Sequence, residues 1–214
     1  MRQVRFDRLK RILCLGAHSD DIEIGCGGTL LKLTAEHPGL EVTWVVCSAG
    51  GVRTMEAKAS ARAFLRHAAA KSRVIVKDFR TSFFPFEGEQ IKQFFETLKP
   101  FQPDLVFTHY RDDRHQDHRV LSDLTWNTFR SHVILEYEIP KYDGDLGAPN
   151  FFVPISRAHC MKKSALLLRH FGSQRDKHWF TSELFLALPR IRGMECASST
   201  LFAEAFYSRK MQLL

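Results

Sequence analysis

The sequence predicts an α/β domain with three layers, in which helices cover both faces of a mostly parallel sheet. Short apolar runs rich in β-branched residues alternate with longer segments of helical periodicity. No internal repeat or linker interrupts this alternation. A length of 214 residues and a hydrophobic content of 44% suit one domain with a sizeable core. We therefore expect a single domain over residues 1–214.

Five segments are predicted to be strands, because each is short, apolar and bounded by polar or turn-forming residues. They are RILCLGA (11–17), LEVTWVVCS (40–48), RVIVKDF (73–79), PDLVFTH (103–109) and VILEYEI (133–139). A helical segment lies between each of these strands and the next. Parallel strands joined by right-handed crossovers are therefore expected.

Six segments are predicted to be helices from the spacing of their apolar residues. They are residues 27–37, 54–70, 87–99, 118–131, 157–171 and 177–195. Thr54 is the expected N-cap of the second helix, and Pro189 is expected to end the last one. Residues 141–154 contain two glycines and two prolines, which predicts an ordered loop or an insertion at the sheet edge.

Cysteine usage indicates a cytoplasmic protein, and the charge pattern does not indicate a nucleic-acid partner. The net charge is +7, but no run of five Lys or Arg occurs, so a nucleic-acid surface is not indicated. The five cysteines include no C-x-x-C pair, which is typical of reduced thiols. No stretch predicts a signal peptide or a membrane span. A homo-oligomer is compatible with this sequence.

Two stretches rich in histidine and aspartate follow the first and fourth predicted strands. AHSDD (17–21) holds His18, and HYRDDRHQDH (109–118) ends with His115 and His118. Because ligands of parallel sheets bind beyond the carboxyl ends of the strands, the two stretches are expected to meet. Imidazole and carboxylate groups suit Zn²⁺ or a similar divalent ion. The sequence therefore predicts a catalytic metal site.

A metal ion explains the paired aspartates of AHSDD. Adjacent carboxylates repel each other, and burying them is costly. One of Asp20 and Asp21 can be a ligand, which the cation stabilises as an anion. The other can take a proton from water beside the ion. Gly25, Gly27 and Gly28 are then expected to turn the chain into the next helix.

Other functional classes lack their motifs. A dinucleotide site requires G-x-G-x-x-G directly after the first strand, whereas Gly25, Gly27 and Gly28 come late and with a different spacing. The G-x-S-x-G elbow of many serine hydrolases does not occur. Cys47 has no adjacent histidine, which is typical of an inert buried thiol rather than a nucleophile.

In their order along the chain, these motifs resemble those of the LmbE-like (PIG-L) family of N-acetylglucosaminyl deacetylases. AHSDD resembles that family's A-H-P-D-D, RHQDH (114–118) its H-P-D-H, and FAEAF (202–206) its Y-A-E-A-F segment. The resemblance implies a Rossmann-like fold and zinc-dependent removal of an N-acetyl group from an amino sugar or its conjugate. Fe²⁺ or another divalent ion is the alternative to zinc. LEYEIPKYDGD and SQRDKHW are similar to a branch associated with polysaccharide or sugar-antibiotic biosynthesis.

The resemblance also implies roles for individual residues. His18, Asp21 and His118 are the expected metal ligands. Asp20 is the expected general base for the metal-bound water that attacks the amide. His115 is expected to polarise the carbonyl group and to stabilise the oxyanion, and either His115 or Asp20 is expected to protonate the leaving amine.

Two further residues receive expected roles, and three depart from the family pattern. Asp117 is expected to orient one of the histidines. Arg53 corresponds to a position associated with substrate binding. Ser19 replaces the usual proline, Ile22 replaces an acidic residue, and Asp113 stands where some relatives have a tyrosine.

Two other functions stay open. The same site could serve a metal hydrolase that cleaves a different amide or a phosphoester. Alternatively, the departures at Ser19 and Ile22 fit a sugar-binding module with weakened catalysis.

Overall fold

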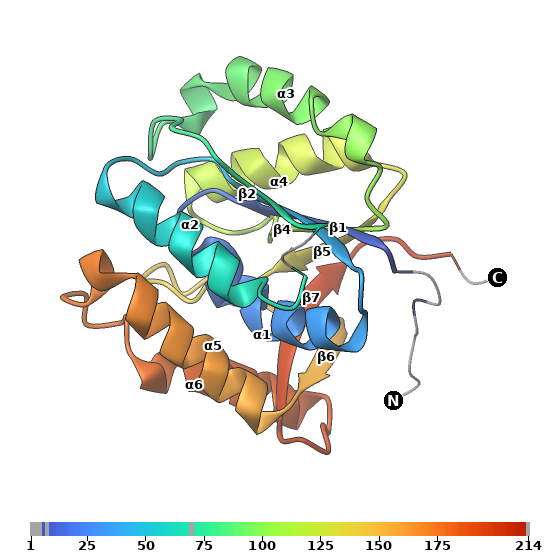
Figure 1. The fold of residues 1–214 in the computed structure, drawn as a ribbon, viewed down its shortest axis with the longest axis vertical. Coiled ribbons are helices and arrows are strands. Elements are labelled where there is room, and N and C mark those ends of the chain that lie inside the picture. Colours follow the sequence, from blue (N-terminus) through green and yellow to red (C-terminus); the bar gives the residue numbers. More distant parts are fainter. Residues whose placement is uncertain (1–5, 7–8, 69–70, 213–214) are drawn as a thin grey trace.

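The computed structural model describes residues 6, 9–68 and 71–212. These residues form a sheet with helices on both faces (Figure 1). Its seven strands in the described residues are β1 (Arg11–Gly16), β2 (Glu41–Val46), β3 (Arg73–Val76), β4 (Leu105–His109), β5 (Val133–Tyr137), β6 (Phe151–Ile155) and β7 (Phe202–Ser208). Strands β1 to β5 are parallel, whereas β7 pairs antiparallel with both β5 and β6. The predicted mostly parallel α/β fold is therefore confirmed.

The helices divide into two layers. Helices α3 (Gly88–Glu96) and α4 (Gln116–Phe129) cover one face of the sheet (Figure 1). The other face carries α1 (Asp21–Glu36), α2 (Val52–Phe64), α5 (Arg157–His170) and α6 (Ser182–Glu195). A separate apolar cluster fills the space on each side of the sheet. None of the helices in the described part of the chain is long and apolar enough to cross a membrane.

The order of the strands reverses between β1 and β4. The order is β3-β2-β1-β4-β5-β7-β6, so the chain first builds outward from β1 to β3 and then returns to the other side of β1. In open parallel sheets, ligands bind at such a reversal, beyond the carboxyl ends of the two strands. The loops that follow β1 and β4 are the two stretches rich in histidine and aspartate.

Several predicted helix boundaries are wrong. Thr54 is not an N-cap: α2 begins earlier, after Gly51, whose φ of +56° suits glycine, and Thr54 Oγ1 donates to the carbonyl oxygen of Ala49 at 2.8 Å. Helix α2 ends at Phe64 rather than residue 70, and residues 69–70 lie outside the described ones. Helix α1 begins at Asp21, six residues before the predicted start, but its backbone is not helical at Cys26, and the piece after Cys26 matches the predicted start at residue 27.

Pro189 does not end the last helix. Helix α6 continues through this buried proline to Glu195. Phe185 packs into the core on one side of Pro189, and Arg192 pairs with Glu138 at 2.6 Å on the other. These buried contacts outweigh the missing backbone hydrogen bond of proline, which local sequence alone cannot reveal.

Candidate metal centre

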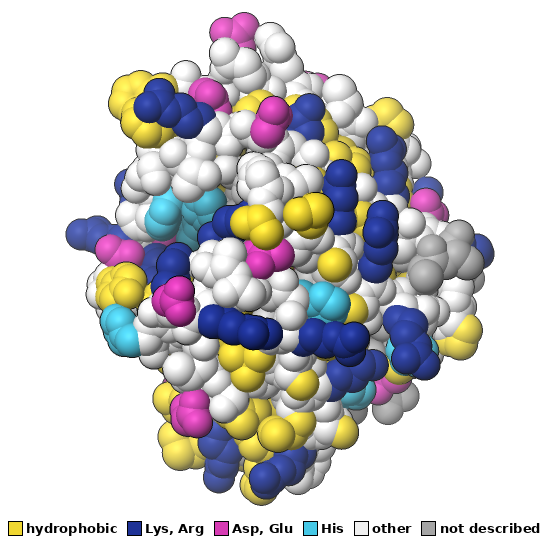
Figure 2. Space-filling view, turned by 60° about the vertical axis from the view of Figure 1, so that its left-hand side comes forward, with side chains coloured by type: hydrophobic (Ala, Val, Ile, Leu, Met, Phe, Trp, Pro, Cys, Tyr) yellow, Lys and Arg dark blue, Asp and Glu magenta, His cyan; other side chains and the backbone are white. Residues whose placement is uncertain are grey.

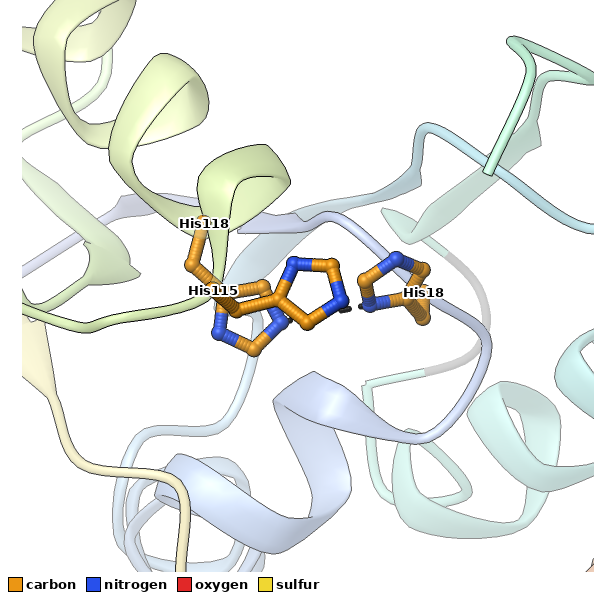
Figure 3. Close-up of side chains that lie close together, drawn as sticks. All are labelled: His18, His115 and His118. Carbon is orange, nitrogen blue, oxygen red and sulfur yellow. Dashed lines mark hydrogen bonds between the residues drawn. The ribbon is translucent and has the colours of Figure 1, made fainter. Parts of the chain in front are cut away.

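The tertiary structure brings the two predicted stretches together at the carboxyl end of the sheet. His18 lies in the loop after β1, and Asp21 is the first residue of α1. His115 is the N-cap of α4, and His118 lies in its first turn. Figure 2 shows histidine side chains in a recess of the surface, and Figure 3 shows His18 facing His115 and His118. The predicted meeting of the two stretches is confirmed.

The three predicted ligands present a compact set of donor atoms. His18 Nδ1 lies 3.2 Å from His118 Nε2 and 3.4 Å from Asp21 Oδ2. His118 Nε2 lies 3.6 Å from the same Asp21 oxygen. Around a tetrahedral ion with bonds of about 2.0–2.2 Å, neighbouring ligand atoms are about 3.3–3.6 Å apart. The residues therefore fit a divalent ion such as Zn²⁺ that keeps a fourth position open.

Carboxylates hold the outer nitrogens of both candidate histidines. His18 Nε2 lies 3.0 Å from Asp117 Oδ2, and His118 Nδ1 lies 2.9 Å from Asp113 Oδ2. The backbone N–H of Ser82 in turn donates to Asp117 Oδ2 at 2.6 Å. A carboxylate on the outer nitrogen fixes the ring and leaves the inner nitrogen free to bind a metal. Asp117 thus makes the contact that its expected orienting role requires.

The charges around the three ligands favour a cation. Burial opposes the charged form of His18, but the carboxylates of Asp21 and Asp117 outweigh it and raise its pKa to about 10. Burial, together with neighbouring His109, lowers the pKa of His118 to about 3. Although burial opposes ionisation of Asp21, the facing histidines hold its pKa well below the usual range. An ionised Asp21 and a neutral His118 are the states that metal binding requires, and an ion held here would take the place of the proton on His18.

His115 presents one ring nitrogen to the recess. It is half-buried, and its Nδ1 accepts a hydrogen bond from the backbone N–H of Asp117 at 3.2 Å. Burial and nearby His18 lower the pKa of His115, which favours the neutral ring. With Nδ1 accepting, we assign the proton of the neutral ring to Nε2. His115 can therefore donate to a substrate oxygen, as its expected role requires.

Asp20 is buried beside the three ligands. It occupies the N-cap position of α1, but its side chain makes no capping hydrogen bond. The Nη2 group of Arg53 donates to Asp20 Oδ1 at 2.9 Å, and Arg53 Nε donates to Ser19 Oγ at 2.7 Å. Burial raises the pKa of Asp20 against the opposing charge of Arg53. Ser19 thus supplies an acceptor that proline cannot offer. Arg53 therefore binds the proposed base. Its expected role in substrate binding stays a prediction.

His109 is a buried site residue to which the sequence pattern assigns no role. Its Nε2 lies 3.2 Å from Asp21 Oδ2 and accepts from the backbone N–H of Ala17 at 3.0 Å. Its ring stacks on that of His118, with 3.9 Å between the ring centroids. Asp21, His109 and His118 also form a second group of close potential ligands. The position of His109 at the carboxyl end of a predicted strand is the sequence feature that points to a place in the site.

Asp113 also has contacts that the sequence pattern does not indicate. It is buried, and its Oδ2 lies 2.9 Å from Lys141 Nζ as well as from His118 Nδ1. Although burial opposes ionisation, His118, His109 and Lys141 hold the pKa of Asp113 well below its usual range. Asp113 therefore supports His118 as an anion.

Replacing Asp113 by Asn is expected to weaken metal binding by about 10- to 100-fold, because the neutral amide no longer polarises His118. Competition with a chromogenic chelator measures this affinity. Asp112→Asn is the matched control, because Asp112 is adjacent in the chain and its side chain is 66% exposed. Equal affinities for wild type and Asp113→Asn would contradict the supporting role.

Comparisons with known proteins identify related sequences and related folds. The sequence profile of the GlcNAc-PI de-N-acetylase family, PIG-L, matches residues 13–129. The "uncharacterized deacetylase YaiS" of Escherichia coli K12 is 26% identical over 179 residues, which are 77% of this chain and 92% of YaiS.

Two solved structures share the fold. The N,N'-diacetylchitobiose deacetylase from Pyrococcus horikoshii is 22% identical with a TM-score of 0.70, covering 94% of this chain and 84% of that one. GalB, the 4-carboxy-2-hydroxymuconate hydratase from Pseudomonas putida KT2440, is 17% identical with a TM-score of 0.74, covering 96% and 98%. Since a hydratase has the same fold, fold alone does not fix the reaction. The profile match spans both histidine-rich stretches and more than half of the chain, and the chain therefore belongs to the PIG-L family of deacetylases.

Proposed function

We propose that this protein hydrolyses the N-acetyl group of an amino sugar or sugar conjugate in a metal-dependent reaction. The observation that carries the proposal is the set of three donor atoms from His18, Asp21 and His118, with Asp20 beside them. A divalent ion held there, of which Zn²⁺ is the first candidate, would supply Lewis acidity that makes water acidic near neutral pH.

Asp20 acts as the general base in this proposal. Its carboxylate takes a proton from the attacking water, and the water oxygen forms a bond with the acetamide carbon. Arg53 Nη2 holds Oδ1 of Asp20 at 2.9 Å, which leaves Oδ2 to receive that proton. Because burial raises the pKa of Asp20, this carboxylate is a stronger base than an exposed one.

His115 stabilises the charge that develops on the carbonyl oxygen. Its Nε2–H is the free donor of the ring, since Nδ1 is bound to the backbone of Asp117. A donor aimed at an oxyanion in a partly buried site stabilises the transition state more than the ground state. The bond between carbon and nitrogen then breaks, and the proton on Asp20 passes to the departing amine. The products are acetate and a free amino sugar.

Exposed apolar side chains occur on two segments that contact the site through other residues, which supports a small organic substrate. Val52 and Met55 flank Arg53 at the start of α2, and both are exposed. Phe86, which is 82% exposed, ends a short 3-10 helix whose first residue, Phe84, donates its N–H to Asp117. Small-molecule sites combine apolar side chains with a few polar groups. The five cysteines are free and buried, which supports a reducing, cytoplasmic location.

The test is a panel of N-acetylated sugars, nucleotide sugars and lipid-linked sugars, incubated with and without a chelator. Metal-dependent release of acetate and free amine from one class would support the proposal. Phosphate release from phosphoester controls would identify the alternative hydrolase instead. Sugar binding by the metal-loaded protein without any acetate release would favour the binding module.

A further inference from the structure

Helix α1 consists of two helical pieces joined at Cys26. The backbone of Cys26, with φ −140° and ψ 15°, is not helical, so the first piece has only residues 21–25. An isolated turn of this length is not stable in water. This short piece begins with the proposed ligand Asp21 and directly follows the proposed base Asp20. Contacts outside the helix must therefore hold it in place.

Glu204 caps the second piece of α1 from a distant part of the sequence. Its carboxylate accepts hydrogen bonds from the backbone N–H groups of Gly28 at 2.9 Å and Thr29 at 2.6 Å. With Cys26 as the junction, these are the second and third N–H groups of the new helix, which an N-cap side chain normally satisfies. Glu204 is the acidic residue of the FAEAF segment in β7.

Lys163 of α5 bridges the two pieces. Its ammonium group donates to the backbone carbonyl of Ile24 in the first piece and to Glu204 Oε1, both at 2.6 Å. A cation therefore lies at the carboxyl end of the first piece and an anion at the amino end of the second, so both charges complement the helix dipoles. The side chains of Lys163 and Glu204 are only 4% and 3% exposed.

The glycines at the junction allow the close packing that this arrangement needs. A Cβ atom on Gly28 would lie 3.0 Å from Glu204 Oε1 and 2.7 Å from a side-chain carbon of Ile155. A Cβ atom on Gly25 would lie 2.2 Å from the ring of Tyr137. The first piece of α1 is therefore pressed against β5, with its end fixed by Lys163.

We infer that Lys163 and Glu204 are positioning residues, which join the two pieces of α1 at Cys26 and thereby hold Asp20 and Asp21 in register with His18 and His118. This inference rests on the proposed metal site. It goes beyond that proposal by naming the residues that set the geometry of the site. Only two residues separate Asp21 from Ile24, so a shift at the junction moves the proposed ligand directly.

The test compares Glu204→Gln and Lys163→Met with Leu167→Ala. Leu167 is fully buried one turn further along α5, so its truncation destabilises the fold without removing a contact to α1 that this inference uses. Zn²⁺ affinity of each metal-free protein is measured by chelator competition, well below its unfolding temperature. Amide hydrogen exchange of Gly28 and Thr29, and kcat and KM for acetate release, complete the comparison.

Both variants of the pair are expected to bind Zn²⁺ at least about 10-fold more weakly, as for other residues that orient ligands. Glu204→Gln should also lose the protection of the Gly28 and Thr29 amides, and both variants should lower kcat more than they raise KM. Leu167→Ala should lower Tm while its Zn²⁺ affinity stays within twofold of wild type. If affinity instead follows Tm across all three variants, or if the pair variants keep wild-type affinity, the positioning role is overturned.

A failure of the proposed deacetylase reaction can be distinguished from a failure of this positioning role. A wild-type protein that binds Zn²⁺ but releases no acetate from any N-acetyl sugar contradicts the deacetylase proposal. The affinity and exchange comparisons do not use turnover, so they still decide the role of Lys163 and Glu204.

Discussion

Asp20→Asn is expected to lower kcat for acetate release by about 10²- to 10⁴-fold, the usual contribution of a general base. Asparagine has nearly the same shape and can still accept a hydrogen bond from Arg53, but it cannot take the proton of the attacking water. The proposed ligands His18, Asp21 and His118 are untouched, so the metal content should stay at the wild-type level. Steady-state kinetics together with elemental analysis measure both quantities.

The control for Asp20→Asn is the same substitution at Asp123. This residue lies on the exposed side of α4 and makes no side-chain contact that the proposed reaction uses. Its variant should retain wild-type kcat. Full turnover by Asp20→Asn would remove Asp20 from the mechanism, and joint loss of metal and turnover would make it a ligand or a structural residue.

His118→Ala is expected to release the metal and abolish turnover. The substitution removes one of three donor atoms and leaves the buried carboxylate of Asp113 facing an empty space. Because losing only a supporting residue weakens metal binding by about 10- to 100-fold, losing a ligand should exceed that range. A bound ion stabilises the folded state by mass action, so the rise in Tm that added Zn²⁺ causes in the wild type should vanish.

His67→Ala provides the comparison, since His67 is exposed beyond the end of α2. It should keep both the metal and its effect on Tm. Wild-type metal content in His118→Ala, measured after gel filtration, would show that the ion is held elsewhere, for example by Asp21 with His109.

The sequence was informative where structure is local. Short β-branched runs identified β1 to β5, because a buried parallel strand requires them on both faces. Helical spacing identified all six α-helices of the described chain, although not their ends. Pro189 misled the prediction, since its cost is offset by buried contacts of Phe185 and Arg192 that adjacent residues do not reveal.

The sequence by itself determined the chemistry of the site. AHSDD and RHQDH supply the imidazoles and carboxylates that a divalent ion prefers, and alternating strands and helices place both at one end of the sheet. This reasoning needs only residue types and the direction of parallel strands, both of which are written in consecutive residues.

Only the tertiary structure decided which atoms meet. It paired His118 with Asp113, placed His109 behind Asp21, and brought Glu204 to the N–H groups of Gly28 and Thr29 across more than 170 residues. Such pairings depend on strand order and on the ångström-scale packing of separate elements. A linear motif specifies neither of them, because the energy of a buried carboxylate depends on the partners that the whole fold brings to it.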